Sequence, residues 1–283
     1  MPISAPKTRV DPFAEAIEFR SDLSDRDYAL WIRLPQSYRN GSLSYPVMVV
    51  LDAEVSFGQA SEIAILEFAG SHAPWGRAVA PIPEFIVVGV ALPSTPPDPL
   101  RRNFEYMPQL RDDDFAPPMR QSLGKLEELL GRGPTFGGAA TFLEILRQEI
   151  LPGVDRHYRT DGSRKVLVGI SASGCFGAFA LFSQPTLFTD YILASPALPE
   201  EIFRMEAAWA ANHDDLRARV LLTAGERELE EPLSIVSGTT RFAELLRHRK
   251  YASLRLDTWI IPGASHVQTL APSISRGLST FSE

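Results

Sequence analysis

Short apolar segments alternate along this chain with longer stretches in which apolar residues recur every three or four positions. Four segments are almost continuously apolar and rich in β-branched residues, namely 47–51, 85–90, 165–170 and 220–224. This composition is typical of strands buried on both faces of a parallel sheet. Residues 28–34 instead alternate apolar with other positions, which predicts an early antiparallel strand covered on one face.

Helical periodicity is clearest over residues 139–157, where large apolar residues recur at steps of three and four. Helices that repeatedly follow buried strands predict an α/β class fold, with a mostly parallel central sheet and helices on both faces. No internal repeat is present, so solenoids and propellers are excluded. We expect residues 1–283 to form a single domain.

Residues 93–137 interrupt this rhythm. Prolines gather at positions 93, 96, 97, 99, 117 and 118, an acidic run occupies 112–114, and one short amphipathic piece surrounds 126–130. A long segment of this kind at the carboxyl edge of a sheet is typical of a lid or substrate-pocket insertion, although a mobile insertion is the alternative. We expect a lid.

Composition removes several classes of function. The 283 residues carry a net charge of −7, opposite to the basic balance that nucleic acid attracts. The one cysteine, Cys175, can form neither an internal disulfide nor a thiolate metal cluster. No signal-peptide core and no run of about 18 apolar residues is found. We expect a soluble cytoplasmic protein without a membrane span.

The stretch 166–177 carries the most informative chemistry. A buried strand ends at Ile170, Ser171 follows at once, and small residues lead into an apolar helix. This is the context of a nucleophile elbow, in which the positions two before and two after the serine must be small. Gly169 fills the first position, whereas Ser173 replaces the usual glycine at the second. We expect Ser171 to be a nucleophile, with helix capping as the alternative role for the serines.

Ser173 is the weaker candidate for the nucleophile, because it lacks the same small neighbours, and Cys175 is interpreted as a small buried hydrophobe. A serine nucleophile needs a base, and His266 follows the strand 254–261 and a short loop, downstream of the serine, as in hydrolases with such an elbow. We expect His266 to be that base, with a structural loop histidine as the alternative. The other four histidines are interpreted as surface residues or lie far upstream. These are His72, His157, His213 and His248.

The acid is expected after the strand 220–224, between the serine and the histidine in chain order. The segment Glu226–Glu231 offers several carboxylates, of which Glu228 is our choice and Glu226 the second; a solvated acidic cluster is the alternative. A carboxylate there would hold the imidazole in the right tautomer. Backbone amides of Glu54 and Ala172 are the expected oxyanion donors.

The chain resembles the esterase D-like branch of the α/β-hydrolases, especially the trilactone siderophore (enterobactin-type) esterases. The likeness rests on the elbow and on the segments 45–52, 137–160 and 191–196. It implies an α/β-hydrolase fold. The segment 102–108 is similar to a family pattern of arginine, acidic residue and Thr-Pro, which implies that Arg102 binds substrate.

Several positions depart from the family pattern. Ala53 replaces the glycine that follows Asp52, Ile170 stands where a histidine or similar residue precedes the serine, and the aromatic residue expected after Pro196 is absent. Siderophore specificity therefore does not follow from the sequence.

These features together predict a serine hydrolase that cleaves a carboxylic ester, lactone or thioester through an acyl-enzyme, without a metal or organic cofactor. The expected partner is a small-molecule ester or lactone. The alternatives are an acyltransferase with the same triad, as in the similar mycolyltransferases, and a non-catalytic binding protein on a hydrolase scaffold. The sequence leaves the oligomeric state open.

Overall fold

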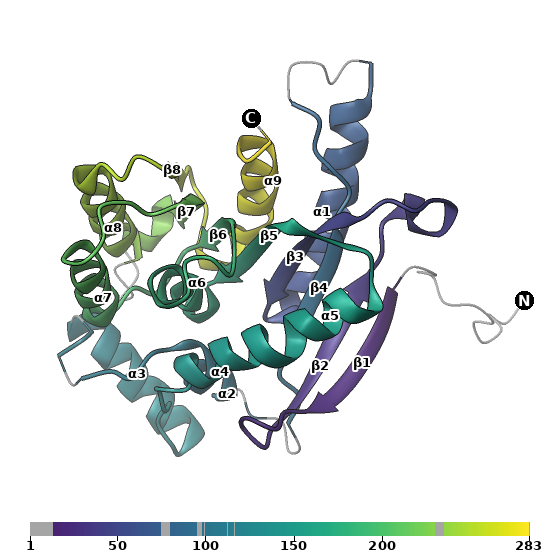
Figure 1. The fold of residues 1–283 in the computed structure, drawn as a ribbon. Helices are drawn as coiled ribbons and strands as arrows, with labels where there is room; N and C mark the ends of the chain where they lie inside the picture. Colours follow the sequence, from purple (N-terminus) through teal and green to yellow (C-terminus); the bar gives the residue numbers. More distant parts are fainter. Residues whose placement is uncertain are drawn as a thin grey trace, which may run out of the picture.

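The computed structural model describes residues 14–74, 80–94, 98, 100–111, 113–115, 117–229 and 235–282. Within these residues eight strands form one sheet in the order β1-β2-β4-β3-β5-β6-β7-β8 (Figure 1). The strands are β1 (Ala14–Arg20), β2 (Asp27–Arg33), β3 (Tyr45–Leu51), β4 (Ile86–Ala91), β5 (Thr160–Ile170), β6 (Asp190–Ala194), β7 (Ala218–Gly225) and β8 (Leu254–Ile261).

Strands β3 to β8 pair in parallel, and β2 runs antiparallel to both β1 and β4. The predicted fold class, a mostly parallel sheet with an antiparallel start, is confirmed. The sequence pattern missed β1, because this edge strand exposes most of its side chains and so lacks a buried apolar run.

The sheet has an apolar core on each face. Along β3, Val47, Val49 and Leu51 pack into one cluster, while Met48 and Val50 pack into the other. Alternate residues of one strand thus serve two separate cores, which is why the segment is apolar throughout.

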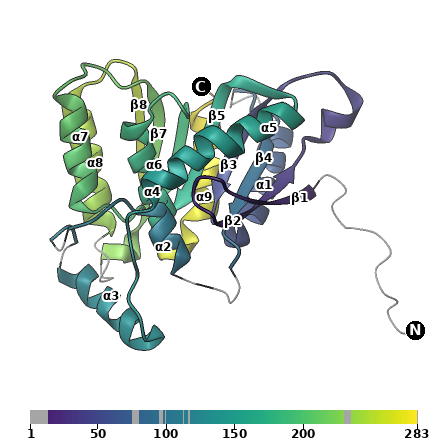
Figure 2. The ribbon, with the colours of Figure 1, turned by 60° about the horizontal axis from the view of Figure 1, so that its bottom comes forward.

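Helices cover both faces (Figure 2). Helices α1 and α9 contact each other and the face that includes Met48, and the face that includes Val47 carries α4, α5 and α6. The helices are α1 (Ala53–His72), α2 (Arg101–Tyr106), α3 (Pro117–Leu130), α4 (Ala139–Ile145), α5 (Leu151–His157), α6 (Ala172–Ser183), α7 (Glu200–Ala210), α8 (Ile235–Arg249) and α9 (Leu270–Thr280).

Two helical segments differ in detail from the expectation. The run 139–157 contains a π-helical stretch at Leu146–Ile150 between α4 and α5. Helix α3 begins at Pro117, well before the amphipathic piece at 126–130, since proline is favoured in a first helical turn. Among the helices of the described residues, none is long and apolar enough to cross a membrane.

The carboxyl end of the parallel strands gathers the short connections of the fold. A single residue separates α1 from the end of β3 there, and a single residue likewise separates α6 from the end of β5. Helices α2 and α3 lie at the bottom of Figure 1, at this edge. Met119 of α3 packs with Ala197 and Ala224, which follow β6 and end β7. The predicted chemistry therefore concentrates at the edge that α3 covers.

Candidate active site

Ser171 lies at the junction of β5 and α6. Its backbone has φ 61° and ψ −116°, a conformation that costs a non-glycine residue about 1–3 kcal/mol. The Ser171 amide donates to the carbonyl of Ala194 (3.0 Å), and the Cys175 amide donates to the carbonyl of Ser171 (2.9 Å). This strained strand-to-helix turn has the geometry of a nucleophile elbow.

The elbow brings the end of β5 against the start of α6. A Cβ atom added at Gly169 would lie 2.3 Å from the carbonyl oxygen of Ser173, so only glycine fits between the two backbones. Ser173, at the second small position, is fully buried. A serine is tolerated there because its hydroxyl has hydrogen-bond partners.

The Ser173 hydroxyl accepts from the Ile170 amide (2.8 Å). The same hydroxyl oxygen lies 2.6 Å from Asp52 Oδ2 and 2.9 Å from the carbonyl oxygen of Ile170, and either can accept its proton. The Ser173 hydroxyl therefore both accepts and donates a hydrogen bond within the protein, which supports Ser171 over Ser173 as the reactive hydroxyl.

His266 and Glu228, far apart in the sequence, are in direct contact. His266 lies in a short 3₁₀ turn, η4 (His266–Gln268), and Glu228 lies in another, η3 (Glu226–Leu229). Their hydrogen bond joins His266 Nδ1 to Glu228 Oε1 at 2.5 Å. The two turns are also joined by the Arg227 amide, which donates to the carbonyl of Ala264 (3.0 Å).

The second carboxylate oxygen of Glu228 is held by two further donors. Ser195 Oγ donates to Oε2 at 2.7 Å, and the Gly225 amide donates to it at 2.5 Å. Burial acts to raise the pKa of Glu228, but the hydrogen bonds from His266, Ser195 and Gly225 outweigh it, so the pKa lies below its usual value. The side chain is fully buried and suited to stay ionised.

The other acidic candidates are placed differently. Glu226 is exposed, and its Oε2 accepts from the amide of Gly263 (2.7 Å) rather than from a histidine. Glu230 and Glu231 lie outside the described residues. Among the described carboxylates of this segment, Glu228 is therefore the one that contacts His266.

Arg102 meets a carboxylate of the protein itself. Its Nε and Nη2 donate to the two oxygens of Asp52, both at 2.8 Å, and Nη2 also reaches the carbonyl of Ile170 at 3.3 Å. The Asp52 side chain is 8% exposed and that of Arg102 is 34% exposed. The guanidinium fork is occupied, so a substrate contact by Arg102 stays a prediction that depends on Nη1.

The amides of Glu54 and Ala172 belong to the first turns of α1 and α6, where N–H groups have no acceptor within the helix. Asp52 immediately precedes α1 with φ 53°. Its hydrogen bond with Ser173 joins the two helix starts. Both expected oxyanion donors thus lie on linked helix ends, and their joint role stays a prediction.

The sequence analysis assigned no role in these hydrogen-bond networks to three polar residues, Asp52, Ser195 and Thr269. Asp52 and Ser195 each follow a strand with a left-handed backbone, at φ 53° and 42°. Thr269 Oγ1 lies 2.9 Å from Ser195 Oγ. A polar residue directly after a buried strand is the only sequence signal that the first two share, and Thr269 offers none.

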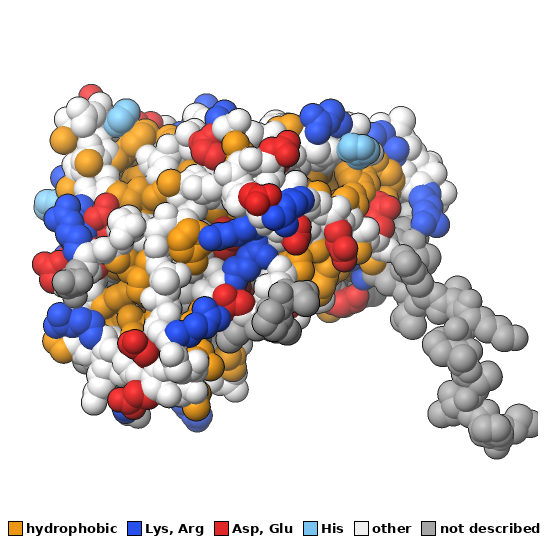
Figure 3. All heavy atoms as spheres, turned by 90° about the horizontal axis from the view of Figure 1, so that it is seen from below, with side chains coloured by type: hydrophobic (Ala, Val, Ile, Leu, Met, Phe, Trp, Pro, Cys, Tyr) orange, Lys and Arg blue, Asp and Glu red, His pale blue; other side chains and the backbone are white. Residues whose placement is uncertain are grey.

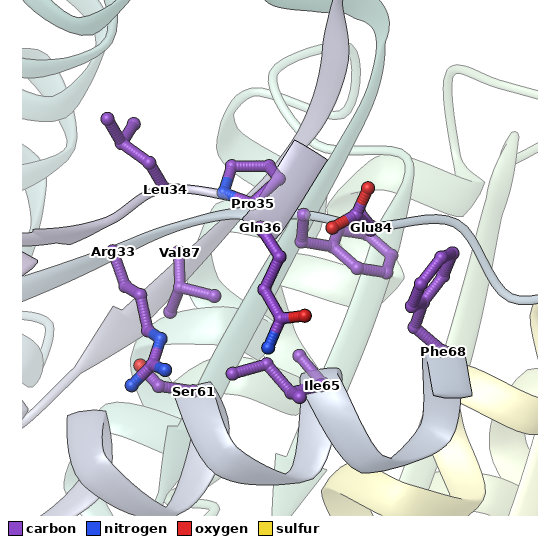
Figure 4. A pocket seen from close by; sticks show the side chains of 11 residues that line it. Arg33, Leu34, Pro35, Gln36, Ser61, Ile65, Phe68, Glu84 and Val87 are labelled. Carbon is purple, nitrogen blue, oxygen red and sulfur yellow. The ribbon is translucent and has the colours of Figure 1, made fainter. Parts of the chain in front are cut away.

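In the described part of the chain, the Ser171 hydroxyl and the His266 ring form no hydrogen bond with each other. In enzymes without substrate this contact is often loose and tightens on binding. Within the same residues, no group of three or more metal-ligating side chains gathers. A separate hollow lies between α1 and the connection after β2, lined by Arg33, Ser61 and Phe68 among others, and contains none of the predicted site residues (Figure 4).

The sheet order, the helices on both faces and the strained serine after β5 define an α/β-hydrolase. Solved structures share this fold. The BES protein from Bacillus cereus has a TM-score of 0.76 at 21% identity, covering 99% of this chain and 98% of its own. The siderophore hydrolase EstA from Aspergillus nidulans has a TM-score of 0.79 at 19% identity, covering 100% and 98%.

Residues 120–250 match the family described as "Putative esterase". The chain is 26% identical over 276 residues to the ferri-bacillibactin esterase BesA of Bacillus subtilis, covering 94% of this chain and 89% of that protein. It is 26% identical over 154 residues to the siderophore triacetylfusarinine C esterase of Aspergillus fumigatus, covering 54% and 44%. The chain is an esterase of the α/β-hydrolase fold, a carboxylic ester hydrolase.

The close approach at the elbow predicts that Gly169→Ala is destabilising. The strand and the helix must separate to admit the methyl group, and we expect the free energy of unfolding in urea to fall by about 3 kcal/mol. Gly58→Ala is the control, because that exposed helical position has nothing within 4 Å of an added Cβ. It should gain about 0.5–1 kcal/mol. Equal stability of the two variants would contradict the close approach.

The lowered pKa of Glu228 predicts a pH-dependent contribution to stability. A carboxyl whose pKa is lower when folded stabilises the protein above its ordinary value of 4.5, and the contribution is lost as the pH falls through the folded value. The difference in unfolding free energy between wild type and Glu228→Gln should therefore be larger at pH 6 than at pH 3.5. Ser195→Ala removes one donor and should reduce this change with pH. A difference that is constant with pH would contradict the assignment.

Proposed function

We propose that this esterase is a serine hydrolase in which Ser171 is the nucleophile, His266 the general base and Glu228 the residue that orients the histidine. The proposal rests above all on the 2.5 Å hydrogen bond between His266 Nδ1 and the buried Glu228 carboxylate. This bond leaves Nε2 of His266 as the nitrogen that exchanges a proton with Ser171.

In the acylation step, Ser171 Oγ forms a bond to the carbonyl carbon of the ester while its proton passes to His266 Nε2. Glu228 stabilises the imidazolium that results. The tetrahedral intermediate then collapses, the bond to the leaving oxygen breaks, and His266 returns its proton to give the free alcohol. The acyl group remains on Ser171.

In the deacylation step, His266 takes a proton from water, whose oxygen attacks the acyl carbon. The intermediate releases the carboxylic acid and Ser171 regains its proton from the histidine. In both steps the carbonyl oxygen carries negative charge, and we assign the amides of Glu54 and Ala172 to hold it. In serine hydrolases, removing one such donor costs about 10²–10³-fold in kcat.

The substrate is a carboxylic ester, lactone or thioester, and we propose a siderophore ester as the physiological class. This narrower proposal rests on the two siderophore esterases that the chain resembles in sequence. Helix α3, within the predicted insertion 93–137, acts as a cover of the site, because its Met119 packs with Ala197 after β6 and Ala224 of β7. Product analysis with and without added alcohol separates hydrolysis from acyl transfer.

Ser171→Ala should lower kcat for a short p-nitrophenyl ester by about 10⁴–10⁶-fold and abolish labelling by a fluorophosphonate probe. Ser173→Ala is the matched control, since it removes a buried hydroxyl two residues away. It should lose about 1–2 kcal/mol of stability but keep most turnover and labelling. A dead Ser173→Ala variant beside an active Ser171→Ala variant would reverse the assignment.

Arg102→Ala should raise KM for an anionic or oxygen-rich ester about tenfold, with kcat nearly unchanged and little effect on a small neutral ester. It also leaves the Asp52 carboxylate without its cation, so we expect a stability loss of about 2 kcal/mol. Arg102→Lys keeps the charge and should recover part of the stability but not the KM. If KM changes equally for charged and neutral esters, Arg102 acts only through its ion pair with Asp52.

A further inference from the structure

A broad hollow lies at the amino ends of the parallel strands, on the edge of the sheet opposite to the candidate active site. Its lining comes from residues that precede or begin β6, β7 and β8, together with Ser163 of β5 and Trp209 near the end of α7. The hollow measures about 1440 Å³ and opens to solvent. Figure 3 shows the other edge, where Lys and Arg side chains are interspersed with Asp and Glu side chains.

The charged residues that line this hollow are mostly cations. Among its described lining residues, three are arginines, Arg217, Arg219 and Arg255, and one is an aspartate, Asp215. The side chains of Arg217 and Arg255 are exposed, and neither forms an ion pair or a hydrogen bond within the part of the chain that the structure describes. The whole chain carries a net charge of −7, so this excess of positive charge is a local exception.

The sheet holds two of these arginines side by side. Arg219 of β7 and Arg255 of β8 share one register position of the parallel pair, where neighbouring strands are about 4.8 Å apart. The fully buried Asp190 is shared by Arg219 and Arg164, so one carboxylate balances two cations there. Like charges at opposed positions of neighbouring strands repel, which destabilises a sheet. An anion bound between the arginines would remove this repulsion.

The groups around the hollow suit phosphate or carboxylate oxygens. Guanidinium groups bind both kinds of oxygen through paired N–H donors. The hydroxyl groups of Ser163, Thr186 and Ser253 line the same hollow, and a hydroxyl also donates to such oxygens. Because several cations surround one concave space, the arrangement favours a small molecule with more than one anionic group.

We propose that this hollow is a binding site for a small polyanion, a molecule with at least two phosphate or carboxylate groups. Arg217 and Arg255 bind the anionic groups, and Arg219, held by Asp190, adds positive charge beside them. The site is separate from ester cleavage, because Ser171 follows the opposite, carboxyl end of β5. A ligand that binds only the folded state there stabilises the protein by mass action without entering the reaction.

Isothermal titration calorimetry of the wild-type protein at constant ionic strength tests this site. The probes are sodium phosphate, pyrophosphate and tripolyphosphate, with citrate as the carboxylate probe. Affinity should rise about tenfold or more from phosphate to tripolyphosphate, because the longer anion meets more of the arginines. Added sodium chloride should weaken binding, since salt screens exposed charges. The relative affinities of citrate and pyrophosphate identify which anionic group the site prefers.

Arg217→Gln and Arg255→Gln should each weaken tripolyphosphate binding about fivefold, and the double variant about 25-fold. Arg156→Gln is the matched control, because it removes the same charge from an exposed side chain of α5 that also forms no ion pair or hydrogen bond among the described residues. It should bind as wild type. Asp215→Asn removes the carboxylate of the lining and should tighten binding about fivefold. Without ligand, the double variant should unfold in urea no earlier than wild type, since it relieves the repulsion between strands.

The possible outcomes separate this inference from the proposed function. Binding that Arg217→Gln and Arg255→Gln weaken and that Arg156→Gln leaves unchanged supports the polyanion site. Failure of both tripolyphosphate and citrate to bind wild type, or equal weakening by Arg156→Gln and Arg255→Gln, overturns it. The kcat/KM for p-nitrophenyl acetate should be the same with and without saturating tripolyphosphate. Inhibition that is competitive with the ester would place the anion at the candidate active site and overturn the inference, while labelling of Ser171 would still support the hydrolase.

Discussion

The arrangement of the candidate site depends on keeping one fully buried carboxylate ionised. Such a group loses the water that would stabilise its charge and needs hydrogen-bond donors in its place. Glu228 obtains them from three separate strand ends, through Ser195 after β6, Gly225 at the end of β7 and His266 after β8. The Glu228 side chain therefore fixes the three connections relative to one another, and it orients His266 as a consequence.

A second buried carboxylate organises the opposite side of the elbow in the same way. Asp52, after β3, binds Arg102 of α2 and Ser173 of α6, so it joins three elements around the strained serine. Asp52, Ser171 and Ser195 all have left-handed φ values directly after strands. Strain of this kind persists only where the surroundings over-determine the backbone, and the two carboxylate networks provide that constraint.

These networks also limit what a ligand can meet. Arg102 engages both oxygens of Asp52 through Nε and Nη2, so its charge is balanced within the protein. A substrate contact by Arg102 would therefore use Nη1, the guanidinium nitrogen outside this ion pair.

The sequence by itself determined the parallel sheet and the elbow, because both leave local marks: apolar runs where strands are buried on two faces, and small residues at set distances from Ser171. It also ranked Glu228 and His266 from chain order. It missed β1, whose exposed edge leaves no apolar run, and the environment of Ser173. Only the tertiary structure decided which groups surround the buried carboxylates, since Ser173 and Asp52 are 121 residues apart and Ser195 and Glu228 are 33 apart. Contacts over such distances depend on how strand ends meet in space, which no local pattern encodes.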